Sequence, residues 1–375
     1  MVETGLDVFL ESPDVYGAVG LLATVASQTH DGMTALRALR EYGINVTAVF
    51  APEHGYFGVG AAGSYIKDEM FGDLPLYSLY GESRSPSHEV LRSLNTVVID
   101  LQDVGLRWYT FLATILNVLR ACQTVGVPVL LLDRPNPLGG VVVEGMRASK
   151  DFLSFVSPAA VPVRYGLTLG EVVLMLNEEI GAQLDVIPMR GWRRQMLYSD
   201  TGLLWCSTSP SMPDPITALV YSGTCLIEGL NVSEGRGTAL PFTQIGAPFV
   251  ESEALAEVMN GFALPGVTFR PCWFMPSTGK YAEQRCGGVR FFVTEPSNYL
   301  GFATGLHLIA ALRAMYPTEV AFIEQDGRYW FDALTGSAYL RHAFESGVTV
   351  AEMLEVCDEE ARAFQAASAP FWLYE

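Results

Sequence analysis

The first half of the chain alternates short, continuously apolar runs with segments whose apolar positions repeat at helical spacing. The strands predicted from the apolar runs are Val19–Ala26, Asn45–Ala51, Thr96–Leu101, Val127–Asp133 and Leu184–Pro188. The helices predicted between them are Thr34–Tyr42, Pro86–Leu94, Tyr109–Val125 and Thr168–Ile180, and a glycine follows all but the second. Continuous apolar runs are typical of parallel strands, which are buried on both faces. The pattern therefore predicts βαβ units and an α/β protein with a parallel sheet.

The second half of the chain is less regular and follows a stretch rich in Ser, Pro and Asp at Trp205–Pro215. Such a stretch is typical of a domain junction, so we expect one domain at residues 1–205 and a second at residues 206–375. In the second domain the pattern predicts helices at Ser252–Phe262, Tyr299–Met315 and Thr349–Gln365, a β segment at Gly288–Thr294 and a glycine-rich loop at Glu234–Gly237.

Composition and charge exclude several classes of partner. The chain has 375 residues, half of them hydrophobic, which is enough to bury a large core. Its net charge of -18 repels phosphate backbones and anionic lipid headgroups, so we expect neither nucleic acid nor a membrane surface as a partner. The six cysteines lie far apart, without the short spacings of zinc or redox sites.

The start of the chain, Met1-Val2-Glu3, is acidic where a signal peptide is basic. No apolar run reaches the roughly 18 residues of a membrane span. As written, the chain is expected to be cytoplasmic, or periplasmic or secreted if a leader was removed.

Charged side chains gather in the loops that leave the predicted strands. Ligands of open parallel sheets bind beyond the carboxyl ends of the strands, so these loops are the place to expect a site. Glu53 follows the second strand, Asp100 and Asp103 the third, and Asp133 the fourth. Carboxylates that converge in a cleft acquire different pKa values and can divide acid and base roles.

Glu53 is the strongest candidate for the acid, because it sits between Pro52 and the His54-Gly55 turn and has no helical face on which to be a solvated charge. Asp100 and Asp133 are as well explained by capping neighbouring loops. We interpret His54 as a residue that orients Glu53, since the five histidines show no paired ligand spacing and a zinc site is not expected.

Arginines and aromatic residues in the same loops are candidates for binding a ligand. Arg offers a planar, bidentate fork to a carboxylate, and Arg107, Arg134 and Arg236 lie in loops of an otherwise acidic chain. For Arg164, a surface salt bridge is the stronger interpretation. Aromatic rings that can stack on a sugar, or simply border the core, are those of Tyr80, Trp108, Tyr109 and Trp205.

The segment Gly58–Gly63 matches the glycine pattern of dinucleotide sites but lacks its context. That pattern cradles a pyrophosphate only directly between a strand and an apolar helix, and here a loop precedes it and a polar segment follows. We interpret the segment as a flexible loop over the cleft. A nucleotide-dependent oxidoreductase or transferase remains a further alternative.

Taken together, the motifs resemble those of the NamZ-type exo-β-N-acetylmuramidases, glycoside hydrolase family 171. The matching segments, spread over nearly the whole chain, are Phe50–Gly55, Leu74–Gly81, Asp100–Gly105, Arg107–Thr110, Leu132–Gly140, Gly166–Glu171, Glu228–Thr238 and Phe331–Ser337. The resemblance implies a Rossmann-like, doubly wound N-terminal domain and a smaller C-terminal α/β domain that closes the cleft. It also implies an exo-acting hydrolase that releases N-acetylmuramic acid from the non-reducing end of peptidoglycan fragments.

In this interpretation Glu53 is the general acid, with Asp103, Asp100 and His54 as its catalytic neighbours. The predicted substrate-binding residues are Arg107, Tyr109, Asp133, Arg134, Asn136, Asn231 and Arg236. The arginines fit this role because muramic acid carries a lactyl carboxylate that an Arg fork can recognise. The expected partner is a carbohydrate, and neither a metal nor a cofactor is needed. A covalent intermediate, direct water attack and assistance by the acetamido group all remain open. The alternative is a non-catalytic sugar-binding protein that uses the same cleft.

Overall fold

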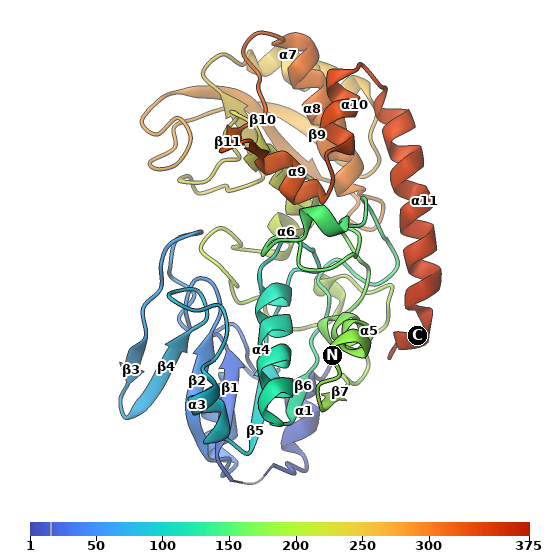
Figure 1. The fold of residues 1–375 in the computed structure, drawn as a ribbon. Coiled ribbons are helices and arrows are strands. Elements are labelled where there is room, and N and C mark those ends of the chain that lie inside the picture. The colour runs from blue at the N-terminus through green and yellow to red at the C-terminus, as the bar shows by residue number, and fades with distance from the viewer. Residues whose placement is uncertain (16) are drawn as a thin grey trace.

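The computed structural model describes residues 1–15 and 17–375 and has two lobes (Figure 1). The first lobe is built on a seven-stranded sheet in the order β3-β4-β2-β1-β5-β6-β7. Its strands are β1 (Val19–Ala23), β2 (Val46–Ala51), β3 (Glu69–Phe71), β4 (Leu74–Ser78), β5 (Thr96–Asp100), β6 (Val129–Leu132) and β7 (Leu184–Ile187). The strands pair in parallel, except that β3 is antiparallel to β4.

Without β3, the strands lie in the order third, second, first, fourth, fifth, sixth, which is the doubly wound Rossmann order. Helices α1 (Gly5–Leu10) and α2 (Ala35–Glu41) pack on one face of the sheet, and α3 (His88–Arg92), α4 (Phe111–Val125) and α5 (Leu169–Ile180) on the other. The prediction of a Rossmann-like parallel sheet is confirmed. It places the carboxyl ends of β1, β2, β4, β5 and β6 at the edge that faces the second lobe (Figure 1).

The second lobe contains a smaller, antiparallel sheet in the order β8-β10-β9, so the expected second, smaller domain is also present. Its strands are β8 (Gln244–Ala247), β9 (Val267–Phe274) and β10 (Cys286–Val293), with a hairpin of β11 (Glu324–Gln325) and β12 (Arg328–Tyr329). Its helices are α6 (Pro215–Thr224), α7 (Ser252–Gly261), α8 (Gly301–Met315), α9 (Trp330–Thr335), α10 (Tyr339–Glu345) and α11 (Val350–Ser368). Short 3₁₀ helices lie at Lys150–Phe152, Tyr198–Asp200, Cys225–Gly229 and Ala369–Phe371.

Helices α6 and α8 pack closely because glycines face each other between them. A Cβ atom on Gly223 would lie 1.8 Å from the carbonyl oxygen of Gly301, so no larger residue fits there. This contact fixes α6, which begins at Pro215, the last residue of the stretch predicted as the junction, and carries part of the site described below.

The C-terminal end of the chain returns to the first lobe. Helix α11 runs along one side of both lobes, and the residues after it lie beside α5 (Figure 1). There the Tyr374 hydroxyl donates to Asp133 Oδ2 at 2.6 Å, and the Leu373 amide donates to Glu171 Oε1 at 2.9 Å. The two lobes are thus tied by more than the connection between them, and the division at residues 205 and 206 stays a prediction.

The predicted elements of both halves are present with shifted ends, and others were missed. The missed ones include the sheet strands β4 and β9 and helix α6. Strand β4 contains Pro75 and has alternating burial, so it lacks the continuous apolar run of the other parallel strands. All three predicted glycine stops, Gly43, Gly126 and Gly181, have a positive φ (82°, 77° and 70°), the left-handed conformation that commonly ends a helix.

Candidate functional site

A cavity of about 390 Å³ lies between the two lobes and is lined by both. The first lobe contributes the loop after β2, the turn before α4 and the segment around Gly63. The second lobe contributes α6, the loop from Glu228 to Phe242, Lys280 and Trp330. Of the residues named from the sequence, Glu53, His54, Tyr109 and Arg236 line this cavity, as do the candidate stacking residues Tyr80 and Trp108.

Glu53 is buried at the wall of the cavity, and both of its oxygens are held. Oε1 accepts a hydrogen bond from the Gly63 amide at 2.8 Å, and Oε2 accepts one from the Thr110 hydroxyl at 2.7 Å. Gly63 belongs to the Gly58–Gly63 segment, so that segment folds back over Glu53. The Thr110 hydroxyl can donate to an ionised carboxylate or accept from a protonated one, because its hydrogen rotates. Thr110 therefore holds Glu53 in place in either protonation state.

His54 is held in one orientation beside Glu53. Its backbone φ is +73°, a left-handed conformation that is uncommon for residues other than glycine and concentrates at functional sites. Its Nδ1 lies 2.7 Å from the Gly60 carbonyl oxygen, which only accepts, so Nδ1 carries the proton of the neutral ring. Burial lowers the pKa of His54, which favours this neutral form. Nε2 is then an acceptor on a residue that lines the cavity.

The second lobe places two carboxylates and two cations at the cavity. Arg236 donates to Glu228 Oε1 through Nε at 3.3 Å and Nη2 at 2.9 Å, and through Nη1 to the Ser211 hydroxyl. Lys280 Nζ lies 3.1 Å from Glu234 Oε2, and Arg236 Nε lies 3.7 Å from Glu234 Oε1. Sequence reasoning missed Glu228, Glu234 and Lys280. The available signal was that both glutamates lie in the same glycine-containing segment as Arg236.

Aromatic side chains form much of the remaining wall. Tyr80, Trp108 and Tyr109 line the cavity, as expected for candidate stacking residues, whereas Trp205 packs edge-on against Tyr198 elsewhere. The Tyr109 hydroxyl donates to Thr208 Oγ1 at 2.7 Å. Tyr221 and Phe242, which sequence reasoning did not single out, line the same cavity.

Asp100 and Arg134 lie outside the cavity and form a buried ion pair with each other. The Arg134 guanidinium bonds both oxygens of Asp100 and also donates to the Gln28 carbonyl at 2.8 Å. This pair lies where β1 and β5 end, the point at which a Rossmann sheet binds a dinucleotide. Protein groups fill that crevice, and the Gly58–Gly63 segment bonds Glu53 instead, so neither feature supports the nucleotide-dependent alternative.

Asp133 and Asp103 are also buried away from the cavity, among protein donors. Asp133 accepts from the amides of Arg134 and Gly170 and from the hydroxyls of Thr168 and Tyr374. Asp103 Oδ2 accepts from the Tyr165 hydroxyl at 2.7 Å and the Gly105 amide at 2.8 Å. Burial raises the pKa of each aspartate to about 6. Both carboxylates thus bond groups of neighbouring loops, which is the arrangement that the capping alternative for Asp133 expects.

Three further residues of the predicted site form hydrogen bonds with backbone groups of the protein and lie outside the cavity. Arg107 is fully buried and donates to the carbonyls of Met146, Val161 and Leu334. Asn136 bonds the Leu167 carbonyl and the Leu138 amide, and Asn231 bonds the Glu319 carbonyl and the Ala321 amide. Each side chain thus ties its own loop to the backbone of a segment distant in the chain. Arg164, expected at the surface, is instead buried and paired with Glu144 at 3.2 Å.

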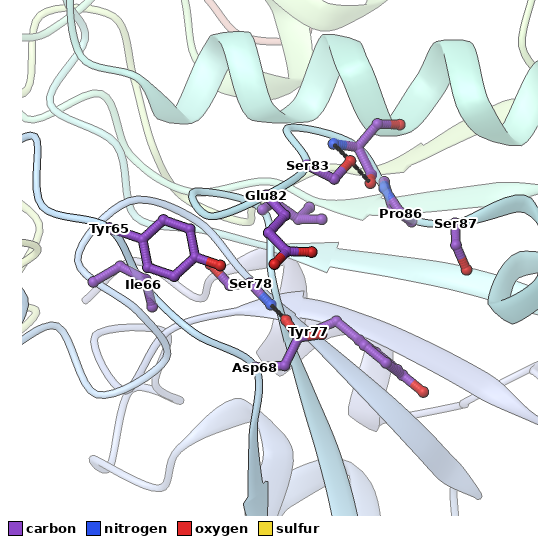
Figure 2. A pocket seen from close by; sticks show the side chains of 11 residues that line it. Tyr65, Ile66, Asp68, Tyr77, Ser78, Glu82, Ser83, Pro86 and Ser87 are labelled. Carbon is purple, nitrogen blue, oxygen red and sulfur yellow. Dashed lines mark hydrogen bonds between the residues drawn. The ribbon is translucent and has the colours of Figure 1, made fainter.

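A second cavity of about 340 Å³ has a lining that comes close to that of the first along the chain, since Leu79 lines the second cavity and Tyr80 the first. Figure 2 shows its side chains, among them Tyr65 and Glu82, which lie close together, and Asp68, whose Oδ1 accepts from the Ser78 amide at 2.8 Å. Its lining comes from the first lobe alone and includes none of the predicted site residues.

Within residues 1–15 and 17–375, no group of three or more His, Cys, Asp and Glu side chains is arranged to hold a metal ion. Over the same described residues, no helix combines the length and the apolar character that crossing a membrane requires.

Comparisons with known proteins match nearly the whole chain to one protein family. The family model "Exo-beta-N-acetylmuramidase NamZ, N-terminal" matches residues 19–216, and its C-terminal counterpart matches residues 219–374. The chain is 37% identical over 385 residues to the peptidoglycan β-N-acetylmuramidase NamZ of Bacillus subtilis, covering 100% of this chain and 91% of that protein.

Solved structures of two DUF1343 family proteins from Bacteroides fragilis share the fold. One has a TM-score of 0.91 and 30% identity, and the other a TM-score of 0.78 and 25% identity. Each alignment covers 100% of this chain and 99% of the other.

Proposed function

The chain belongs to the exo-β-N-acetylmuramidase NamZ family, and from this premise we propose that its interlobe cavity binds N-acetylmuramic acid at the non-reducing end of a peptidoglycan fragment. The protein is an exo-acting glycoside hydrolase. The observation that carries the proposed site is that Glu53, the leading candidate acid, faces a cavity whose opposite wall carries two further carboxylates.

Glu53 is the general acid of the proposal. Glycoside hydrolysis needs a carboxylic acid that protonates the leaving oxygen. The Thr110 hydroxyl can bond the Glu53 carboxyl group in its protonated form and in its ionised form. Glu53 is buried at the wall of the cavity, within reach of a group that enters it. His54, with Nδ1 bonded to Gly60, offers Nε2 as an acceptor for a substrate hydroxyl.

Glu234 is the second carboxylate of the proposal, in place of Asp100 or Asp103. It is buried, it lines the cavity, and Lys280 and Arg236 lie beside its two oxygens. A carboxylate held between two cations suits the charged role, as a nucleophile, as a base or as the partner of an oxocarbenium-like transition state. Glu228 is less suited, because the Arg236 fork already bonds one of its oxygens.

Arg236 is the residue of the predicted arginine cluster that can meet the lactyl carboxylate. A guanidinium has five N–H donors, and the contacts to Glu228 and Ser211 use three of them. Two N–H groups are left for a ligand. Arg107 and Arg134 are bonded within the protein and take no part in this step.

The test of this function is incubation of the protein with a muramic acid-terminated disaccharide and with its N-acetylglucosamine-terminated counterpart. We expect release of N-acetylmuramic acid from the first, identified by mass spectrometry. Release from neither would contradict the proposed substrate. A non-catalytic sugar-binding protein, the alternative prediction, is not favoured by the family membership, and it would bind both disaccharides without cleaving them.

The cellular compartment stays a prediction. It is expected to be the cytoplasm for the chain as written, and the periplasm or the exterior if a leader is removed.

A further inference from the structure

The residues that line the interlobe cavity differ in exposure, and the difference shows where the cavity opens. Glu53 and Glu234 are buried, at 7% and 6% exposure. Among the described residues of the lining, the exposed ones are Ala62 and Gly63 of the first lobe and Trp330 of the second, which is 40% exposed. We call the edge that these three residues border the mouth of the cavity. Each lobe contributes to it.

Glu53 lies between the mouth and the buried part of the lining. Its Oε1 accepts from the amide of the exposed Gly63 at 2.8 Å, and its Oε2 accepts from the hydroxyl of the buried Thr110 at 2.7 Å. A general acid stands on the side of the leaving group, because it protonates the oxygen of the bond that breaks. An exo-acting enzyme takes the terminal sugar into the closed end of its site. The rest of the saccharide therefore extends past Glu53 toward the mouth.

Trp330 is held at the mouth by its backbone. It is the first residue of α9, and the next residue, Phe331, is fully buried. A Cβ atom on Gly229 would lie 2.7 Å from the Cα of Phe331, so the start of α9 packs directly on the 3₁₀ helix Cys225–Gly229. The Trp330 amide donates to the Ile323 carbonyl at 3.2 Å, and the Ile323 amide donates to the Gly229 carbonyl at 2.8 Å. The backbone of Trp330 is thus fixed to the cavity wall, while its side chain remains exposed.

The chemistry of Trp330 selects the kind of group that it can bind. An exposed apolar side chain needs no explanation by itself, but this one borders a cavity that holds the candidate acid. An indole ring offers a large, flat apolar face. A pyranose with equatorial substituents, such as N-acetylglucosamine, carries only C–H bonds on its two faces and can lie flat on such a ring. The sugar that passes Glu53 toward the mouth has this shape.

We propose that Trp330 forms the subsite for the leaving-group sugar, by stacking on the C–H face of the first sugar beyond the bond that is cleaved. The assignment rests on the proposed function, because it takes Glu53 as the acid of an exo-acting reaction in this cavity. It makes Trp330 a residue that selects for a second sugar, and it leaves recognition of the released sugar to the buried lining.

The variant Trp330→Ala removes the ring, and Trp330→Phe keeps a smaller one. For the muramic acid-terminated disaccharide we expect Trp330→Ala to raise KM about tenfold and to leave kcat unchanged, because stacking stabilises the ground state and the transition state alike. Trp330→Phe should recover most of the loss. Trp273→Ala is the matched control, because Trp273 is 60% exposed on β9 of the same lobe and lies outside the cavity lining. We expect no kinetic change there.

The second arm identifies the sugar that Trp330 contacts. In a Glu53→Gln background, calorimetry with the disaccharide and with N-acetylmuramic acid gives a cycle of two proteins and two ligands. We expect Trp330→Ala to weaken binding of the disaccharide about tenfold and to leave binding of the monosaccharide unchanged. The melting temperature should not change, because the ring is exposed.

Equal weakening of both ligands would place Trp330 on the released sugar, and weakening of neither would mean that it contacts no ligand. Either result would overturn the leaving-group subsite. Because this arm needs no turnover, it decides on the subsite even if the hydrolysis assay fails. Failure of hydrolysis in the unsubstituted protein contradicts the proposed function and not the subsite. If the Glu53→Gln protein binds neither ligand, both proposals are contradicted.

Discussion

The loop after β2 and the loops after β5 and β6 leave the same edge of the sheet, and each carries carboxylates, yet they do different work. Glu53 after β2 has one donor for each oxygen and borders the cavity. Asp133 after β6 has four donors from the protein and no access to solvent. A carboxylate surrounded by protein donors holds the fold together, whereas one that borders a cavity keeps capacity for a ligand.

This difference explains how far sequence reasoning reached. The continuous apolar runs located the strands, and the strand order placed Glu53, Asp100 and Asp133 at one edge. Which of them faces the cavity depends on partners distant in the chain. The Tyr374 hydroxyl that donates to Asp133 comes from 241 residues away, and no local sequence pattern predicts this contact.

The same limit applies to the second wall of the site. Glu234 reaches the cavity on the segment that follows α6. Helix α6 was not predicted because Thr217–Thr224 are all buried, so small polar residues are mixed with apolar ones and no amphipathic pattern marks the helix. Arg236 was predicted because its residue type is unusual in an acidic chain. Its neighbour Glu234 has a residue type that is common there, which gave no reason to single it out.

Glu53→Gln should have the largest effect on activity. Glutamine keeps an acceptor and the side-chain shape but cannot protonate the leaving oxygen, so we expect kcat to fall about 10³–10⁴-fold in a disaccharide cleavage assay. Glu82→Gln is the matched control, because Glu82 lines the neighbouring cavity (Figure 2) and should leave kcat unchanged. Full activity of Glu53→Gln would mean that the loop after β2, like the loops after β5 and β6, does not supply the catalytic acid.

Glu234→Gln should have the next largest effect. If Glu234 provides the second carboxylate, we expect kcat to fall about 10²-fold or more, while calorimetry still detects binding of N-acetylmuramic acid. Asp100→Asn lies outside the cavity and tests the earlier candidate. If Asp100→Asn lost more kcat than Glu234→Gln at equal melting temperature, Asp100 in the loop after β5 would be the second carboxylate instead.

Asp133→Ala should act on stability. It leaves two backbone amides and two hydroxyls without their acceptor in a buried place, so we expect the free energy of unfolding to fall by about 3–5 kcal/mol. Denaturant titration measures this change, and kcat of the folded fraction should be retained. Asp133→Asn should recover part of the loss, because the two hydroxyls can rotate to accept from its amide. Loss of kcat without loss of stability would mean that Asp133 serves the site after all.

Asp103→Asn should have the smallest effect, and one that depends on pH. Burial raises the pKa of Asp103 from 3.8 to about 6 in the folded protein. Between these two values the unfolded chain has already released the proton that the folded protein keeps, so the Asp103 contribution to the free energy of unfolding falls as the pH rises. The fall is about 3 kcal/mol, at 1.36 kcal/mol for each pKa unit. Asparagine does not titrate, so denaturant titrations of both proteins at pH 4, 5, 6 and 7 should show the unsubstituted protein losing stability relative to Asp103→Asn over this range. A constant difference would mean that Asp103 is ionised throughout, and its unpartnered Oδ1 would then need a bound water or another donor.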